Sequence, residues 1–166
     1  MRNDMEIRKA TKKDLSDILK IYEHARSFMA EHGNPNQWGK TNPPKERVIQ
    51  DIEEEKCHVC IRDGEIAGVF YCACEADATY AEIEGEWLNS QPYAVVHRIA
   101  VGENQSGVAT YCLNWAFENY HNVRIDTHKD NIPMQHLLKK LCFTYCGVIT
   151  LSDGSPRIAF QKSENV

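Results

Sequence analysis

A strand, a polar turn and a helix over residues 93–119 carry the groups best suited to bind an anion. β-Branched and apolar residues over Ala94–Val101 predict a buried strand. The turn Gly102–Gly107 follows, and apolar residues from Val108 onwards recur at helical spacing. The first N–H groups of a helix have no partner within the helix, and the helix dipole favours negative charge there. The segment therefore predicts a site for an anion, typically a phosphate.

The seven cysteines raise a second chemical option, a metal site. Cys57 and Cys60 are separated by two residues, which is a spacing typical of zinc ligands. Both lie in a predicted strand, however, and residues three apart on a strand point to opposite faces. Cys72 and Cys74 lie in an apolar strand, where cysteine packs as a small hydrophobe. We therefore predict reduced, buried thiols and no metal site.

The length and charge of the chain narrow the class of protein. A chain of 166 residues is expected to form a single domain over 1–166 with a sizeable core. The net charge of −5 argues against a nucleic-acid partner, which would need a basic face. No apolar run approaches the ~20 residues that span a membrane, and the N-terminus lacks the apolar core of a signal peptide. We expect no membrane partner and a cytoplasmic location.

Hydrophobic periodicity predicts seven strands and four helices. Helices and strands alternate in the C-terminal half, whereas hairpins occur in the N-terminal half, so we expect a mixed α/β (α+β) sheet with helices on both faces. Asp63-Gly64 suits a type I′ hairpin turn, because both central residues need positive φ. Strands are expected at 6–10, 57–62, 65–75, 94–101, 123–127, 143–151 and 157–161, and helices between 11 and 33, over 45–55, from 108 and from 133.

Two segments resemble motifs of the GCN5-related N-acetyltransferase (GNAT) superfamily. Residues 98–109 resemble the family's acetyl-CoA pyrophosphate motif, Q/R-x-x-G-x-G/A. Residues 125–143 resemble its second motif, in which an Asn opens a helix that ends in K-x-G-F; Asn131, Lys140 and Phe143 stand at the matching places. The order of elements also agrees over nearly the whole chain. The resemblance implies a centrally splayed sheet of about six or seven strands, and acetyl transfer from acetyl-CoA to an amine.

The chain departs from the family pattern at several positions. Asn104 stands where the family prefers Gln or Arg, which affects one side-chain contact to the pyrophosphate. Cys142 replaces the usual Gly. Leu138 occupies the place of a Tyr that protonates the departing CoA thiolate in many members, so that general acid is not carried over. Tyr145 lies nearby in sequence but on the following strand, and we do not assign it this role.

The resemblance implies acetyl-CoA as co-substrate, without a metal. Its pyrophosphate would lie against the turn and the helix start, where Gly107 has no side chain to block the approach. Its pantetheine arm would pair with the backbone of the preceding strand, as in strand addition. Asn131 would bond the arm from the other side or cap its own helix. The expected cofactor-binding residues are Ile99, Ala100, Val101, Asn104, Gln105, Ser106, Gly107, Val108, Ala109 and Asn131.

The attacking amine must lose a proton, because a free alkylamine with a pKa of about 10.4 is charged at neutral pH. His97 on the central strand is the first candidate base, since histidine titrates near neutral pH; a packed core histidine is the other interpretation. Glu84 and Glu86 are the next candidates, or they are plain solvated acids. Strand alternation would place Arg98 on the opposite face, and we assign it no catalytic part. A backbone N–H near Ile99 or Val101 would stabilise the oxyanion.

The acceptor depends on the loops 31–44 and 76–92, whose sequences indicate no specific chemistry. Trp38 either anchors the first loop or lines a substrate cleft. The expected acceptor is a small-molecule or peptide amine, which attacks directly in a ternary complex. The missing Tyr at 138 leaves an alternative, a non-catalytic acyl-CoA-binding or regulatory module. Many relatives pair through sheet edges, so the resemblance is compatible with a homodimer, although no sequence feature requires one.

Overall fold

The computed structural model describes residues 4–164. Within this range four α-helices form, each at a predicted place. Their bounds are α1 Leu15–Glu31, α2 Lys45–Glu53, α3 Val108–Tyr120 and α4 Ile132–Lys140. The strands are β1 Met5–Lys9, β2 Cys57–Arg62, β3 Glu65–Cys74, β4 Glu84–Gly85, β5 Ala94–Val101, β6 Asn122–Thr127, β7 Thr144–Thr150 and β8 Pro156–Ser163.

All eight strands described over residues 4–164 belong to one sheet, in the order β1-β2-β3-β5-β6-β8-β7-β4. Among these eight described strands only β5 and β6 pair in parallel, so the sheet is mixed as predicted. The strand number exceeds the expected six or seven because the short β4, within the connection before β5, pairs with β7 at the sheet edge. Two residues of β4 carry no periodicity from which a strand is predictable.

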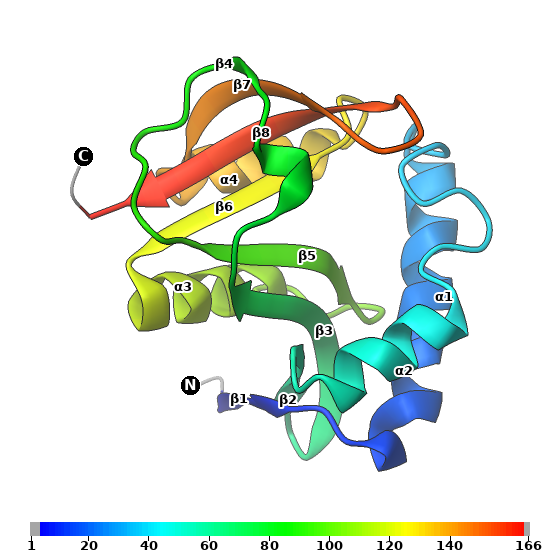
Figure 1. The fold of residues 1–166 in the computed structure, drawn as a ribbon. Coiled ribbons are helices and arrows are strands. Elements are labelled where there is room, and N and C mark those ends of the chain that lie inside the picture. The colour runs from blue at the N-terminus through cyan, green and yellow to red at the C-terminus, as the bar shows by residue number, and fades with distance from the viewer. Residues whose placement is uncertain (1–3, 165–166) are drawn as a thin grey trace.

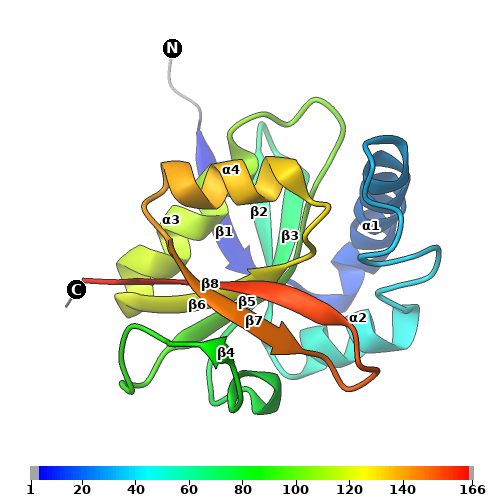
Figure 2. The same cartoon turned by 90° about the horizontal axis from the view of Figure 1, so that it is seen from above.

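Helices cover both faces of the sheet, as predicted (Figures 1 and 2). On one face, α1 and α2 bury a core against β2 and β3 that includes Cys57 and Val59. On the other face, α3 and α4 bury a larger core that includes Cys60 and Leu138. Cys57 and Cys60 therefore belong to different cores, which confirms that this pair points to opposite faces of the sheet.

The sheet divides between β5 and β6. These strands pair only at Ala94–Val123 and Val95–Arg124, so the rest of β5 has no strand on that side within residues 4–164 (Figure 1). A register shift between β3 and β5 accompanies the separation, and Arg98 within it has φ +51°. Such bulges bend a strand and are frequent beside functional sites. The result is the predicted splayed centre of the sheet.

Gly68 on β3 allows α3 to pack closely on the sheet. A Cβ built at this position would lie 2.6 Å from Val108 Cγ1 and 3.3 Å from the Ala100 carbonyl oxygen. Val108 is completely buried at the first turn of α3, so it has little room to move away.

We expect Gly68→Ala to lower the free energy of unfolding by about 1–3 kcal/mol, because an extra methyl group overpacks this contact. In the double variant Gly68→Ala/Val108→Ala the clash is relieved, so urea unfolding should show a smaller loss than the sum of the two single variants. Strictly additive losses would contradict a steric contact between residues 68 and 108.

Candidate active site

A cleft of about 360 Å³ opens where β5 and β6 separate. His97 and Arg98 of β5 line one side, and Asp126 of β6 and Arg157 of β8 line the other. The loop between α1 and α2 borders the cleft and contributes Trp38. A volume of this size accommodates a small molecule. The cleft therefore brings groups of both charges to the centre of the sheet.

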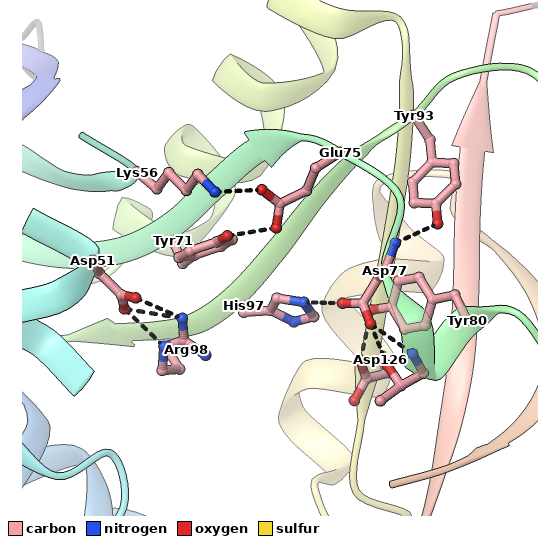
Figure 3. Close-up of polar contacts among 11 residues, drawn as sticks. Asp51, Lys56, Tyr71, Glu75, Asp77, Tyr80, Tyr93, His97, Arg98 and Asp126 are labelled. Atoms are coloured by element: carbon pink, nitrogen blue, oxygen red, sulfur yellow. Dashed lines mark hydrogen bonds and ion pairs between the residues drawn. The ribbon is translucent and has the colours of Figure 1, made fainter. Parts of the chain in front are cut away.

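His97 is paired with a carboxylate from a distant part of the chain (Figure 3). Its Nε2 lies 2.7 Å from Asp77 Oδ2, and both side chains are partly exposed. Burial raises the pKa of Asp77, but hydrogen bonds from His97 and Thr79 outweigh it and lower this pKa to about 2. An ionised carboxylate can only accept, so Nε2 carries the proton of this hydrogen bond. In the neutral ring, Nδ1 is then the nitrogen that can accept another proton.

A second carboxyl group, Asp126, lies beside this pair in the cleft (Figure 3). The buried Tyr80 hydroxyl donates to Asp126 Oδ2 over 2.6 Å. Burial raises the pKa of Asp126, although His97 and Tyr80 act in the opposite direction. The two environments therefore push the pKa values of Asp77 and Asp126 apart, an arrangement that allows two acids in one site to differ in protonation.

Arg98 corrects the expectation from strand alternation. We expected it on the opposite face from His97, yet both line the cleft, because the bulge at Arg98 breaks the alternation. Its guanidinium donates two hydrogen bonds to the buried Asp51 of α2, at 3.0 and 3.1 Å, and lies 4.7 Å from the centre of the Tyr71 ring. The Tyr22 hydroxyl donates to its carbonyl oxygen over 2.8 Å. These contacts stabilise the bulge, and the ion pair with Asp51 neutralises the charge of Arg98.

The turn after β5 presents its backbone at the start of α3. Gly107 is the N-cap with φ +82°, and Asn104 also has positive φ. Arg62 of β2 supports this turn from the sheet. Its two terminal nitrogens donate to Gln105 Oε1 over 3.1 Å and to the Ser106 carbonyl over 2.9 Å. The Gln105 side chain is therefore engaged in holding the turn, while the first N–H groups of α3 point outward from the helix end, as those of a helix N-terminus do.

Asn131 both caps α4 and borders the cleft. Its Oδ1 accepts from the Met134 N–H over 3.2 Å, and its Nδ2 donates to Gln37 Oε1 over 2.9 Å. The two interpretations of Asn131 are therefore compatible, since the cap residue stands at the cleft wall. Trp38 likewise combines both of its interpretations, because it packs edge-on against Tyr22 and lines the cleft.

Comparison with solved structures decides the family. A GNAT-family acetyltransferase from Streptococcus agalactiae 2603 is 33% identical, with a TM-score of 0.87 over 96% of this chain and 95% of that chain. The chain belongs to the GNAT family of acetyltransferases. Membership supports acetyl transfer as its general chemistry. No protein-family model matches the chain, and no curated protein sequence matches it significantly.

More distant structures share the fold of this GNAT protein. A GNAT-family acetyltransferase from Listeria monocytogenes 4b F2365 is 18% identical, with a TM-score of 0.72 over 98% of each chain. AAC(6′)-Ib in complex with ribostamycin and coenzyme A is 15% identical, with a TM-score of 0.66 over 98% of this chain and 95% of that chain.

The structure places the predicted site residues of this GNAT protein in three regions. His97 and Ile99 line the cleft, whereas Ala100 and Val101 continue β5 towards the turn and pair with β3. Glu84 and Glu86 lie elsewhere. Glu84 belongs to β4 at the outer edge of the sheet, and both side chains are exposed and do not border the cleft. The cofactor-binding residues predicted in the turn and at the start of α3 follow β5 directly.

Sequence reasoning missed Asp77, Asp126 and Arg157. Asp77 lies 20 residues before His97 on an irregular connection, so no local spacing links the two. Asp126 belongs to a predicted strand that also carries Arg124 and Thr127, so a charged residue at this position gave no specific signal. Over residues 4–164, no cluster of His, Cys, Asp and Glu could hold a metal, and no helix is long and apolar enough to cross a membrane.

The ionisation of Asp77 should make the free energy of unfolding depend on pH. A folded pKa of about 2 lies below the ordinary value, so ionised Asp77 stabilises the fold above about pH 4, and this contribution is lost as the pH falls towards 2. We expect urea unfolding to show wild type more stable than Asp77→Asn at pH 5, on the order of 1–2 kcal/mol after solvent screening. The difference should shrink between pH 4 and 2. A difference that stays constant over this range would contradict the depressed pKa.

Proposed function

We propose that this GNAT protein transfers the acetyl group of acetyl-CoA to a primary amine by direct attack in a ternary complex. The observation that carries the proposal is the His97–Asp77 pair on the splayed strand β5, in a cleft of small-molecule size. The anion-binding turn directly follows this strand in sequence. A thioester held along β5 would therefore have a phosphate site on one side and a base on the other.

The residues of this chain suit acetyl-CoA. The pyrophosphate would accept hydrogen bonds from the N–H groups of residues 107–109, and Arg62 would keep the turn in place. The pantetheine arm would pair with the side of Ile99–Val101 that has no neighbouring strand, and Asn131 would flank it. AAC(6′)-Ib, which shares this fold, is solved with coenzyme A and ribostamycin.

His97 is the proposed base. Its Nδ1 would accept the proton that the amine nitrogen loses as that nitrogen bonds to the acetyl carbon. Asp77 would hold the ring through Nε2–H and stabilise the imidazolium, as carboxylates do for histidine bases. A backbone N–H near Ile99 or Val101 would stabilise the oxyanion. The C–S bond then breaks, and the thiolate would take its proton from solvent, since the buried Leu138 offers no donor.

Replacing His97 should slow the chemical step and leave cofactor binding intact. We expect His97→Gln to lower kcat by about 10²–10⁴, the usual contribution of a general base, with the acetyl-CoA Kd within roughly twofold of wild type. The measurements are release of the CoA thiol with a panel of amines, and calorimetry. His136→Gln, exposed on α4, is the matched control and should retain wild-type rates.

Two outcomes would contradict parts of this proposal. Full turnover by His97→Gln would exclude His97 as the base. Binding of acetyl-CoA by wild type without thiol release over the whole amine panel would exclude the transferase and favour the non-catalytic acyl-CoA-binding module.

The phosphate turn can be tested separately with a pair of glycines. Gly107 and Gly154 have similar φ values, +82° and +89°, but Gly154 lies in the exposed turn between β7 and β8. We expect Gly107→Ala to raise the acetyl-CoA Kd by about tenfold or more, because a side chain strains the turn and obstructs the phosphate. Gly154→Ala introduces the same strain and should leave Kd unchanged. Equal effects of both substitutions would mean that residue 107 has no particular role in binding.

A further inference from the structure

Arg157 on β8 is a buried cation that no carboxylate of residues 4–164 contacts in an ion pair. Arg157 is only 8% exposed to solvent, and it lines the cleft. Its guanidinium donates to two neutral carbonyl oxygens, that of Pro156 over 2.8 Å and that of Gln37 over 3.1 Å. Within residues 4–164 it forms no ion pair with Asp or Glu. Because buried charges are normally paired, Arg157 is suited to an anion that enters the cleft from outside.

Three other arginines in the structure are satisfied differently. Arg8 and Arg98 pair with carboxylates, those of Asp14 and Asp51. Arg124 lies between the rings of Trp87 and Tyr93, 4.1 and 4.0 Å from their centres. Arg157, in contrast, is buried, lines the cleft and retains N–H groups that can donate to a ligand. A guanidinium has five N–H donors in a planar fork that matches the two oxygens of a carboxylate, and only two hydrogen bonds are made here.

The position of Arg157 in the cleft indicates that it would contact the acceptor and not the phosphates of the cofactor. None of the described residues of the Gly102–Gly107 turn lines the cleft, whereas Arg157 shares it with His97 and Asp126. In the β6–β8 register Asp126 faces Ala159, so Arg157 is its diagonal neighbour, roughly 7–8 Å away along such ladders. The proximity of the two charges is reflected in Asp126, whose pKa Arg157 lowers against the larger effect of burial.

We propose that Arg157 binds a carboxylate of the acceptor, so that the substrate class is an amino acid or another small amine that carries a carboxylate. This rests on the proposed function, because it concerns the amine that His97 deprotonates. The amine would lie on the β5 side of the cleft, near His97 and the ionised Asp77, and the carboxylate would receive a bidentate pair of hydrogen bonds from Arg157 on the other side. The same guanidinium would keep its bond to Gln37 and so hold the loop before α2 at the cleft.

The test uses pairs of acceptors in which one carries a carboxylate and the other lacks it or carries an amide instead. Wild-type protein is assayed for thiol release with 4-aminobutyrate against propylamine, lysine against cadaverine, and glycine against glycinamide. We expect kcat/KM for carboxylated acceptors to be roughly 10–100-fold higher, as for a hydrogen bond to a charged group. This comparison needs no substitution and therefore does not depend on the folding of a variant.

Variants separate recognition from loop anchoring. Arg157→Met should remove the preference by raising KM for carboxylated acceptors only, and Arg157→Lys should restore part of it. Arg26→Met is the matched control, since Arg26 also donates to a backbone carbonyl of this loop, that of Asn42 over 3.3 Å, yet does not line the cleft. It should leave the preference unchanged.

The outcomes distinguish this proposal from the proposed function. If wild type acetylates amines but decarboxylated acceptors react equally well, the carboxylate site is wrong and the transferase stands. Equal losses on both acceptor classes in Arg157→Met would assign Arg157 to the loop alone and also overturn the carboxylate site. Absence of thiol release with every acceptor would instead overturn the transferase itself.

Discussion

The bulge in β5 is the constraint on which the rest of the site depends. At Arg98 the backbone adopts a positive φ that non-glycine residues rarely take, so the surrounding structure must hold it there. Three contacts do so, from the Tyr22 hydroxyl, the Asp51 carboxylate and the Tyr71 ring. β5 leaves β6 after Val95, shortly before this bulge, and the cleft opens between the two strands.

The charges in the cleft come from a few of its lining side chains and from their partners. The Asp77 carboxylate is kept ionised by His97 and Thr79, whereas burial favours the neutral form of Asp126. Arg98 is neutralised by Asp51, which leaves Arg157 as a buried cation at the other side. With the ionised Asp77 on the His97 side and Arg157 on the other, the cleft is matched to the proposed acceptor, a small molecule with both an amine and an acid.

Much of the fold was predictable because local physics and tertiary structure agree. Asp63 and Gly64 both have positive φ, as the predicted type I′ turn requires. The bounds of β5 and the start of α3 after Gly107 match the pattern of β-branched residues and the glycine turn. The separation of Cys57 and Cys60 into two cores follows from strand alternation. Alternation was misleading only at Arg98, where the bulge interrupts it.

The sequence alone determined the mixed sheet, its helices and the glycine turn before α3, since these depend on periodicity and on residues adjacent in the chain. It also indicated His97. The tertiary structure decided the partners of His97 and the charges opposite it. Asp77, Asp126 and Arg157 come from a connection and two separate strands, and they meet only because β5 and β6 diverge. Glu84 and Glu86, the next candidates in sequence, lie away from the cleft because β4 pairs with β7 at the sheet edge. Proximity between such distant residues is a property of the sheet order, which no local spacing encodes.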